Sequence, residues 1–242
     1  NAEGGINTIK GNNLDNEFTL VDADKVSANG ITFESIASVD GLGGDNEIIG
    51  SANQQWQLSG TNNAITGNSI DFTSIVKATA TNGTVLGTNN ADTFLLSTGL
   101  NSDNQVTANA ITFSDVATVT GGTGDDSITG TDSAEEFTLV DDDKVLAKEI
   151  TFSGITDVNA EGGINTIKGN NLDNKFTLVD TDKVSANAIT FENIASVDGL
   201  GGDNEIIGLA NQQWQLSGTN NAITGNSIDF TSIVKATATN GT

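Results

Sequence analysis

The residues of this sequence best suited to chemistry are carboxylates that stand in glycine-rich turns. The clearest run is GGTGDDSIT at 121–129, in which Gly122 and Gly124 precede Asp125 and Asp126. Carboxylate oxygens and the carbonyl oxygens of a tight glycine turn are ligands that a hard cation such as Ca²⁺ prefers. These four residues are therefore candidate ligands of a calcium ion.

The same turn recurs elsewhere in altered form. DGLGGDNEI at 40–48 keeps Asp45, and the matching run later in the chain keeps Asp203, so both are further calcium candidates. The run ATATNGTV at 78–85 has no carboxylate. The alternative is that Gly, Asn and Asp only satisfy left-handed turn geometry while the carboxylates stay in water, and the sequence leaves both interpretations open. Solvated turns are also expected for the acidic runs that begin at Asp22, Asp141 and Asp180.

Few other chemistries are open to this chain. His, Cys, Met, Pro, Tyr and Arg are all absent, and the nine cationic residues are all Lys. Paired carboxylates alone can cleave glycosides, which keeps a β-helical polysaccharide-degrading enzyme as an alternative. The carboxylates recur along the chain, however, whereas a catalytic cleft is usually single. We therefore expect a protein that is not an enzyme.

The charge of the chain restricts its partners and its location. The formal net charge is −23 over 242 residues, and nine scattered Lys cannot form the basic stripe that nucleic acid requires. No apolar run of about 18 residues exists, so we expect no transmembrane segment. The lack of Cys and of most oxidisable side chains suits long exposure outside a cell. We expect an extracellular or cell-surface protein.

The chain repeats itself at two levels. Residues 1–84 recur as 159–242, a shift of 158 residues, with differences at only five positions: Glu17/Lys175, Ala23/Thr181, Gly30/Ala188, Ser35/Asn193 and Ser51/Leu209. Within this block, Ile-Thr-Phe or Ile-Asp-Phe begins a shorter unit, which starts at Ile31, Ile70, Ile111, Ile150, Ile189 and Ile228. Successive starts are about 39 residues apart, a period typical of repeat architectures.

All twelve Phe and Trp residues fall at two positions of this unit. One series contains Phe18, Trp56, Phe94, Phe137, Phe176 and Trp214. The other contains Phe33, Phe72, Phe113, Phe152, Phe191 and Phe230. Such regular placement predicts that the rings fill equivalent interior positions and stack as ladders that form the structural core.

The spacing of apolar residues predicts an all-β fold. Apolar residues alternate over three to five positions between Gly, Asn and Asp clusters, which indicates short half-buried strands, and no window has a helical period. A 39-residue unit is too small to bury a core alone. We therefore expect a parallel β-solenoid (β-helix) with two coils in each unit and about twelve coils in all, although one wider coil per unit stays open. Residues 1–242 would form one continuous solenoid, a fragment of a longer array.

The glycine turn and the strand before it resemble a known class of repeats. The run ITFSDVATVTGGTGDDSITG at 111–130 is similar to the repeat regions of giant bacterial secreted and surface proteins. These are large adhesins, filamentous-haemagglutinin-like proteins and hemolysin-type calcium-binding repeat proteins. The resemblance implies an extracellular β-solenoid, with Ca²⁺ as the ion that such repeats bind between adjacent turns.

These observations predict a structural function. We expect a stalk or filament of a bacterial cell surface or matrix, adhesive or scaffolding, whose partners are copies of itself or a surface. A calcium-dependent adhesin module that binds a surface or a glycan is the alternative. Ice binding would need ranks of Thr on one face, which only KATAT at 77–81 and 235–239 offers. Sugar binding through Trp56 and Trp214 competes with burial of both rings.

Overall fold

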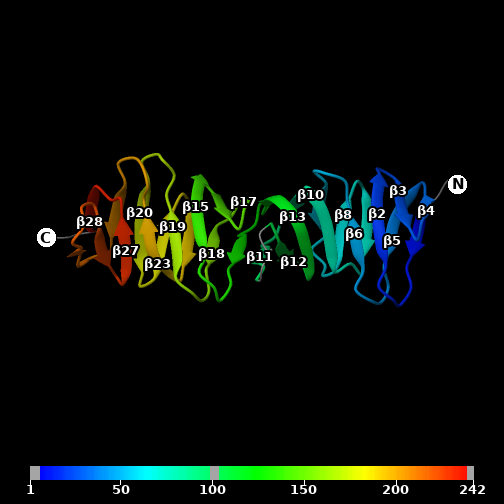
Figure 1. The fold of residues 1–242 in the computed structure, drawn as a ribbon, viewed down its shortest axis with the longest axis horizontal. Helices are drawn as coiled ribbons and strands as arrows, with labels where there is room; N and C mark the ends of the chain where they lie inside the picture. The colour runs from blue at the N-terminus through cyan, green and yellow to red at the C-terminus, as the bar shows by residue number, and fades with distance from the viewer. Residues whose placement is uncertain (1–5, 99–103, 239–242) are drawn as a thin grey trace.

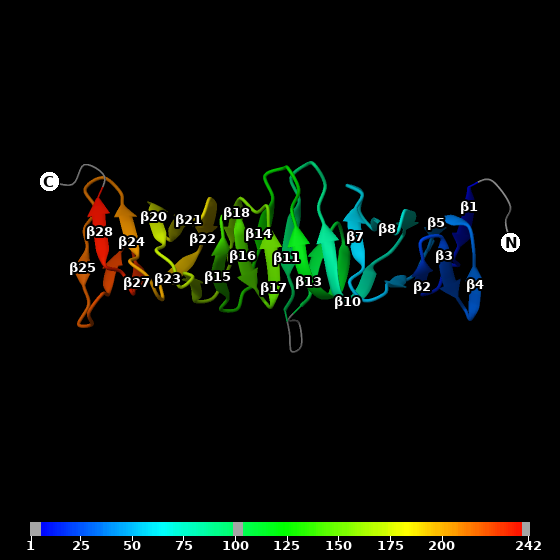
Figure 2. The ribbon, with the colours of Figure 1, turned by 90° about the horizontal axis from the view of Figure 1, so that it is seen from above.

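The protein is a rod built from strands and turns. The computed structural model describes residues 6–98 and 104–238, and these residues contain strands but no helix. The first and the last described strands, β1 (Asn7–Lys10) and β28 (Lys235–Ala238), lie at opposite ends of the rod (Figure 2), and the strands follow one another along its long axis in both views (Figures 1 and 2). The fold is a parallel β-solenoid of about eight turns, as the all-β pattern of the sequence predicts.

Strand pairing forms two ladders that both run the length of the rod. Ladder A contains, in order, β1 (Asn7–Lys10), β5 (Ile36–Asp40), β9 (Ile70–Thr73), β8 (Ala64–Gly67), β7 (Gln55–Leu58), β10 (Lys77–Leu86), β13 (Ile111–Thr120), β17 (Ile150–Ser153), β16 (Lys144–Ala147), β15 (Glu136–Asp141), β19 (Asn165–Lys168), β23 (Ile194–Asp198), β27 (Ile228–Thr231), β26 (Ile223–Gly225) and β25 (Gln215–Leu216).

Ladder B contains the remaining strands and shares β10 and β13 with ladder A. In order they are β4 (Ile31–Phe33), β3 (Lys25–Ala28), β2 (Glu17–Asp22), β6 (Glu47–Ile49), β10, β13, β12 (Val106–Ala108), β11 (Thr93–Leu96), β14 (Ser127–Thr129), β18 (Asp157–Asn159), β22 (Ile189–Glu192), β21 (Lys183–Ala186), β20 (Lys175–Asp180), β24 (Glu205–Gly208) and β28 (Lys235–Ala238). The long strands β10 and β13 belong to both ladders, because the register shifts midway along each of them.

The coil is wider than the sequence predicts. Stacked residues of successive coils lie 30 residues apart at Asn16 and Asn46, and 34 residues apart at Asp92 and Asp126. The prediction of two coils in each 39-residue unit and about twelve coils in all is therefore wrong, since the chain makes about eight turns. The added length lies in three-stranded antiparallel meanders, the first of which is β2–β3–β4 in ladder B and the second β7–β8–β9 in ladder A.

The second turn of each of these two meanders is a two-residue loop in the left-handed region. Asn29 and Gly30 have φ of 50° and 73°, and Asn68 and Ser69 have 48° and 66°. Two consecutive positive φ values are the mark of a type I′ turn, which matches the twist of an antiparallel pair. Since successive meanders alternate between the ladders, equivalent positions of consecutive sequence units lie on opposite sides of the rod.

The aromatic side chains form the core, but they do not stack as ladders. Phe18, Trp56, Phe72, Phe94, Phe113, Phe137, Phe152, Phe176, Phe191 and Phe230 are all less than 2 % exposed. Phe33 and Trp214 are only partly buried. Each ring that lies in a parallel pair stands beside an aliphatic residue, such as Phe18 beside Ile48 and Phe72 beside Val39. The predicted ladders of aromatic on aromatic are therefore wrong.

Two pairs of rings meet across the core instead, while Trp56 contacts Phe72 within ladder A. The centroids of Phe94 in ladder B and Phe152 in ladder A lie 6.4 Å apart, and those of Phe137 and Phe191 lie 6.1 Å apart. Such distances are in the favourable range for aromatic pairs. Burying each Phe contributes about 1.5–3 kcal/mol. The two ladders are thus joined by an apolar core along the rod.

Candidate functional site

The most regular polar feature of the rod is a set of stacked turns. Among the described residues, eight six-residue turns begin with Gly, or with Ala160, and end with an inward Asn, Asp or Glu. The turns are hydrogen-bonded in four pairs: 11–16 with 41–46, 87–92 with 121–126, 130–135 with 160–165, and 169–174 with 199–204. The predicted calcium residues all belong to these turns.

In each pair, the last side chain of the second turn holds the stack together. Oδ1 of Asn46 accepts hydrogen bonds from the backbone amide of Asn16 at 2.9 Å and from its Nδ2 at 2.7 Å. Nδ2 of Asn46 donates to the carbonyl oxygens of Gly43 at 3.1 Å and Ser74 at 2.9 Å. One buried amide therefore satisfies polar groups of three consecutive coils. The corresponding bonds recur at Asn165 and at Asn204.

The remaining stack, formed by the turns 87–92 and 121–126, has the carboxyl group of Asp126 in place of the asparagine amide. Oδ1 of Asp126 accepts the backbone amide of Asp92 at 2.8 Å, as an asparagine would. Asp126 is fully buried and its Oδ2 has no hydrogen-bond partner. Oδ2 and the carbonyl oxygen of Gly154 both lie 2.5 Å from the point where a Cβ on Gly121 would stand. Gly154 occupies the position of Ser74, whose carbonyl oxygen accepts a hydrogen bond from Nδ2 of Asn46. Oδ2 of Asp126 takes the place of that donor, so an acceptor lies next to an acceptor.

The surroundings of Asp126 disfavour its charged form. Burial raises the pKa of this carboxyl above its usual range, the hydrogen bond from the Asp92 amide opposes the rise, and the carboxylates of Asp92 and Asp125 add to it. Asp92 differs because its Oδ2 accepts hydrogen bonds from the amide of Thr88 at 2.6 Å and from its hydroxyl at 2.9 Å. The buried atom without a hydrogen-bond partner in this stack is thus Oδ2 of Asp126. Binding of a proton or a cation would satisfy it.

The other predicted calcium residues do not converge on Asp126. Asp125, Asp45 and Asp203 are exposed. The backbone amides of Asp45 and Asp203 donate to the carboxylates of the stacked residues Asp15 and Asp173, at 2.8 Å and 2.7 Å. Within the described parts of the chain, no group of three or more acidic side chains is placed to hold a metal ion. Any cation at Asp126 would depend on backbone carbonyl oxygens for its remaining ligands.

The glycines of the turn have a packing role that needs no ion. A Cβ on Gly124 would lie 2.3 Å from the carbonyl carbon of Asn90 in the stacked turn. A Cβ on Gly122, whose φ is 117°, would lie 1.9 Å from the carbonyl oxygen of Thr88. Only glycine allows these backbones to approach so closely. Stacking of the turns therefore accounts for the glycine pattern that the sequence links to calcium.

The acidic runs that begin at Asp22, Asp141 and Asp180 lie at hairpin turns. Their Oδ1 atoms accept the backbone amide of the next residue at 2.8–2.9 Å, and all three residues are exposed. They are solvated turns, in the place where the sequence predicts them.

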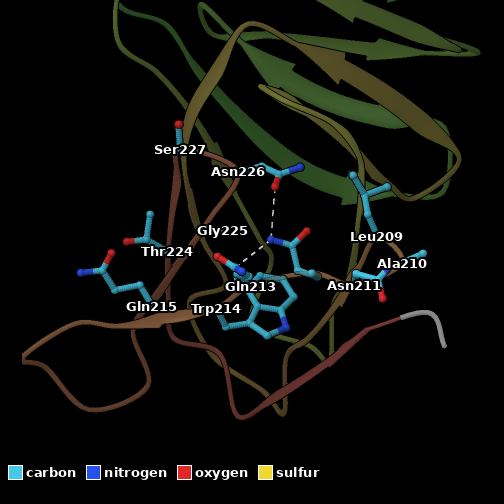
Figure 3. A pocket seen from close by; sticks show the side chains of 11 residues that line it. Leu209, Ala210, Asn211, Gln213, Trp214, Gln215, Thr224, Gly225, Asn226 and Ser227 are labelled. Atoms are coloured by element: carbon cyan, nitrogen blue, oxygen red, sulfur yellow. Dashed lines mark hydrogen bonds between the residues drawn. The ribbon is translucent and has the colours of Figure 1, made fainter. Parts of the chain in front are cut away.

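A second candidate site is a groove at the C-terminal end of the rod. Its volume is about 610 Å³, and Figure 3 shows the indole of Trp214 within it, below Leu209 and Asn226. Nε2 of Gln212 donates to Oδ1 of Asn226 at 3.2 Å and to the carbonyl oxygen of Gln213 at 2.9 Å. The groove offers one partly exposed aromatic face with amide groups around it.

The corresponding tryptophan of the first copy is closed off. Trp56 is 1 % exposed because Val85 of β10 lies directly beside it in the parallel register. Sugar binding through Trp56 is therefore excluded in this fold. Trp214 is only partly buried, and the sequence ends at the equivalent of Thr84, before the residues that would correspond to Val85 and Leu86. The sequence could not separate the two residues, because their neighbours are almost identical.

Comparison with known proteins does not assign the chain to a family. No family model matches the chain, and no curated protein matches it. Among the described residues, no helix is long and apolar enough to cross a membrane.

Proposed function

We propose that this chain is a structural segment of an extracellular array, a stalk or filament of a bacterial cell surface or matrix that gives length and displays surface. The observation that carries this proposal is the continuity of the two ladders from β1 to β25 and from β4 to β28. Backbone hydrogen bonds and one apolar core follow the whole axis, so a repeat added to the sequence lengthens the rod without a new type of contact.

The near-identity of 1–84 and 159–242 supports the same proposal. A function that needs length tolerates duplication of large blocks, whereas a single site does not require a second copy. We propose that the 39-residue sequence unit is the step by which such an array lengthens. The net charge of −23 keeps such rods apart from one another in solution.

Electron microscopy of cells tests this function. Antibody against the purified chain should label extended fibres or stalks outside the cell, and deletion of one 158-residue block from the gene should shorten them. Label confined to the cytoplasm, or fibres of unchanged length after the deletion, would contradict the proposal.

A second candidate function is a calcium-dependent adhesin module, and one observation favours it. Oδ2 of Asp126 is buried without a partner and lies near the backbone carbonyl oxygen of Gly154, an oxygen of the kind that calcium prefers. Calorimetric titration of the chelator-treated chain with Ca²⁺ tests it, with Asp126→Asn as the matched control. Binding by the wild type that the variant lacks would support the module, and no heat in either protein would reject it.

A further inference from the structure

The inward asparagine of a turn stack holds its amide nitrogen inside a group of backbone oxygens. Nδ2 of Asn46 lies 3.1 Å from the carbonyl oxygen of Gly43 and 3.4 Å from that of Gly44, both in its own turn. It lies 2.9 Å from the carbonyl oxygen of Ser74 in the next coil. Asn46 has no exposed surface. One buried nitrogen atom is therefore surrounded by oxygen atoms from two consecutive coils.

The same group of oxygens surrounds the asparagines of two further stacks. Nδ2 of Asn165 lies 3.3 Å from the carbonyl oxygen of Ala160 and 2.9 Å from that of Gly162, both in its own turn. It lies 3.1 Å from the carbonyl oxygen of Asn193 in the next coil. Nδ2 of Asn204 lies 3.0 Å from one carbonyl oxygen of its own turn and 3.0 Å from one of the next coil. The arrangement is therefore a repeated feature of the rod.

Each of these amides is fixed in one orientation. Oδ1 of Asn46 accepts two hydrogen bonds from Asn16, one from the backbone amide and one from Nδ2. Turning the amide over would bring Oδ1 to the carbonyl oxygens and Nδ2 against these two donors, so the hydrogen bonds on both sides would be lost. The backbone amides of Glu135 and Asn174 hold the corresponding oxygens of the other two stacks. The nitrogen therefore always faces the carbonyl oxygens.

This donor set does not fit a metal ion. Carbonyl oxygens from two coils are ligands that Ca²⁺ prefers, but the position among them is filled by an N–H donor. A cation there would have to displace the amide, and the side chain cannot offer its oxygen in exchange. The resemblance of the glycine turns to calcium-binding repeats therefore does not extend to metal binding in these three stacks.

The stack of turns 87–92 and 121–126 shows the alternative. Asp126 makes the same bond to the stacked turn through Oδ1, and its Oδ2 stands where the other stacks have Nδ2, without a donor. A change of one atom, from nitrogen to oxygen, thus separates a stack that is closed by its own side chain from one that leaves a place for a proton or a cation.

We propose that the amides of Asn46, Asn165 and Asn204 take the place of a bound cation between the coils, so that these three stacks close without a divalent ion. This inference goes beyond the stalk function, which requires no particular means of closing a coil. A bound ion stabilises a fold only when its concentration exceeds its dissociation constant. An amide that belongs to the chain gives its hydrogen bonds in any medium, so most of the rod would keep its turns where calcium is scarce.

Hydrogen exchange of the whole chain, in chelator and at a saturating concentration of Ca²⁺, tests the proposal. The backbone amides of Asn16, Glu135 and Asn174 report on the three stacks, because each donates to Oδ1 of the inward asparagine. They should exchange at the same rate in both conditions. An effect of Ca²⁺ that is confined to the amide of Asp92 would also support the proposal, since only that stack lacks the nitrogen donor.

Asn46→Asp should convert a closed stack into one that depends on calcium. Without the donor, the amide of Asn16 should exchange about tenfold faster or more in chelator, because a buried oxygen would face the carbonyl oxygens. Ca²⁺ should reverse most of this change. Asn46→Ala, which removes the donor without adding a carboxylate, should exchange fast in both conditions.

Asn12→Asp is the matched control. It adds the same charge to an exposed position of the stacked turn, so exchange at the amide of Asn16 should stay as in the wild type and should not respond to Ca²⁺.

Three results would overturn the proposal. The first is slower exchange in Ca²⁺ at the amide of Asn16, Glu135 or Asn174 of the wild type. The second is an Asn46→Asp variant whose exchange Ca²⁺ does not change, and the third is an equal response to Ca²⁺ in Asn12→Asp. The wild-type comparison needs no variant, so it decides whether the three stacks close without calcium even where Asn46→Asp does not fold.

Discussion

The backbone amide of Asp92 donates to Oδ1 of Asp126 at 2.8 Å, across 34 residues of sequence. Asn16 and Asn46 form the same bond at 2.9 Å, as do Asn174 and Asn204. The stacks therefore share one geometry, and only the chemistry of the second side-chain atom differs. In Asp126 that atom is an acceptor without a donor.

Asp126→Asn should stabilise the protein at neutral pH. The amide would donate to the carbonyl oxygen of Gly154, as Nδ2 of Asn46 donates to that of Ser74, and satisfying a buried polar group is worth about 1–3 kcal/mol. Urea unfolding in the presence of chelator measures the change in the free energy of unfolding. A variant less stable than the wild type at neutral pH would contradict the arrangement described for Oδ2.

The gain from Asp126→Asn should depend on pH. Since burial raises the folded-state pKa of Asp126 above the ordinary value of about 3.9, the proton on this carboxyl stabilises the fold at acidic pH. That contribution is lost as pH rises through the raised pKa. The two proteins should therefore be most alike in acid and should diverge as the pH increases. Unfolding curves at a series of pH values give the comparison, and a constant difference would show that Asp126 does not titrate there.

Asn46→Asp should reproduce the same defect in another stack. Its Nδ2 donates to Gly43 and Ser74, so a carboxylate would face two carbonyl oxygens in a buried place. We expect a loss of about 1–3 kcal/mol at neutral pH that becomes smaller in acid. Asn12→Asp changes an exposed residue of the stacked turn and serves as the control. Equal effects of both substitutions would mean that net charge, not the buried acceptor, is responsible.

The sequence predicts the strands and the interior positions better than their partners. Alternation of apolar residues marks Phe18, Phe72 and Phe113 as inward, and all three are buried. Alternation does not say whether the next strand continues the coil or folds back on the last one. The Asn29–Gly30 pair is a strong sequence signal for a type I′ hairpin. At Lys148 and Glu149 the same left-handed pair of φ values, 48° and 61°, has no sequence signal at all.

The candidate site was predictable only in part. The glycine run at 121–129 correctly marks a tight turn, yet it does not distinguish Asp125, which is exposed, from Asp126, which is buried. That difference arises from the stacked turn that contains Asp92, which lies far outside any local pattern. Likewise, the burial of Trp56 depends on β10, which lies beside it, and the local sequence around Trp56 does not reveal that neighbour.

Gly124→Ala should destabilise the protein by about 1–3 kcal/mol, the usual range for overpacking. The added Cβ would stand 2.3 Å from the carbonyl carbon of Asn90, so the two stacked turns would have to separate. Gly30→Ala is the matched control, because nothing lies within 4 Å of its Cβ position and the second copy has Ala188 there. Thermal unfolding of both variants measures the contrast. Similar losses at both positions would indicate that backbone freedom, not the contact between turns, decides the cost.

Phe113→Ala should cost about 3–5 kcal/mol, the range for removing a buried ring. Phe113 has no exposed surface and lies in the half of β13 that belongs to ladder B, beside Ala78 on one side and Val106 on the other. Its small neighbour Ala78 cannot fill the cavity. Ser114→Ala, at the next residue, loses only the hydrogen bond from Gln105 and should cost about 0.5–1.5 kcal/mol.

Hydrogen exchange should show whether the loss at Phe113 opens only the nearby strands, as nearest-neighbour coupling in a solenoid requires. Uniform loss of protection along the whole rod would mean instead that the eight turns unfold as one cooperative unit.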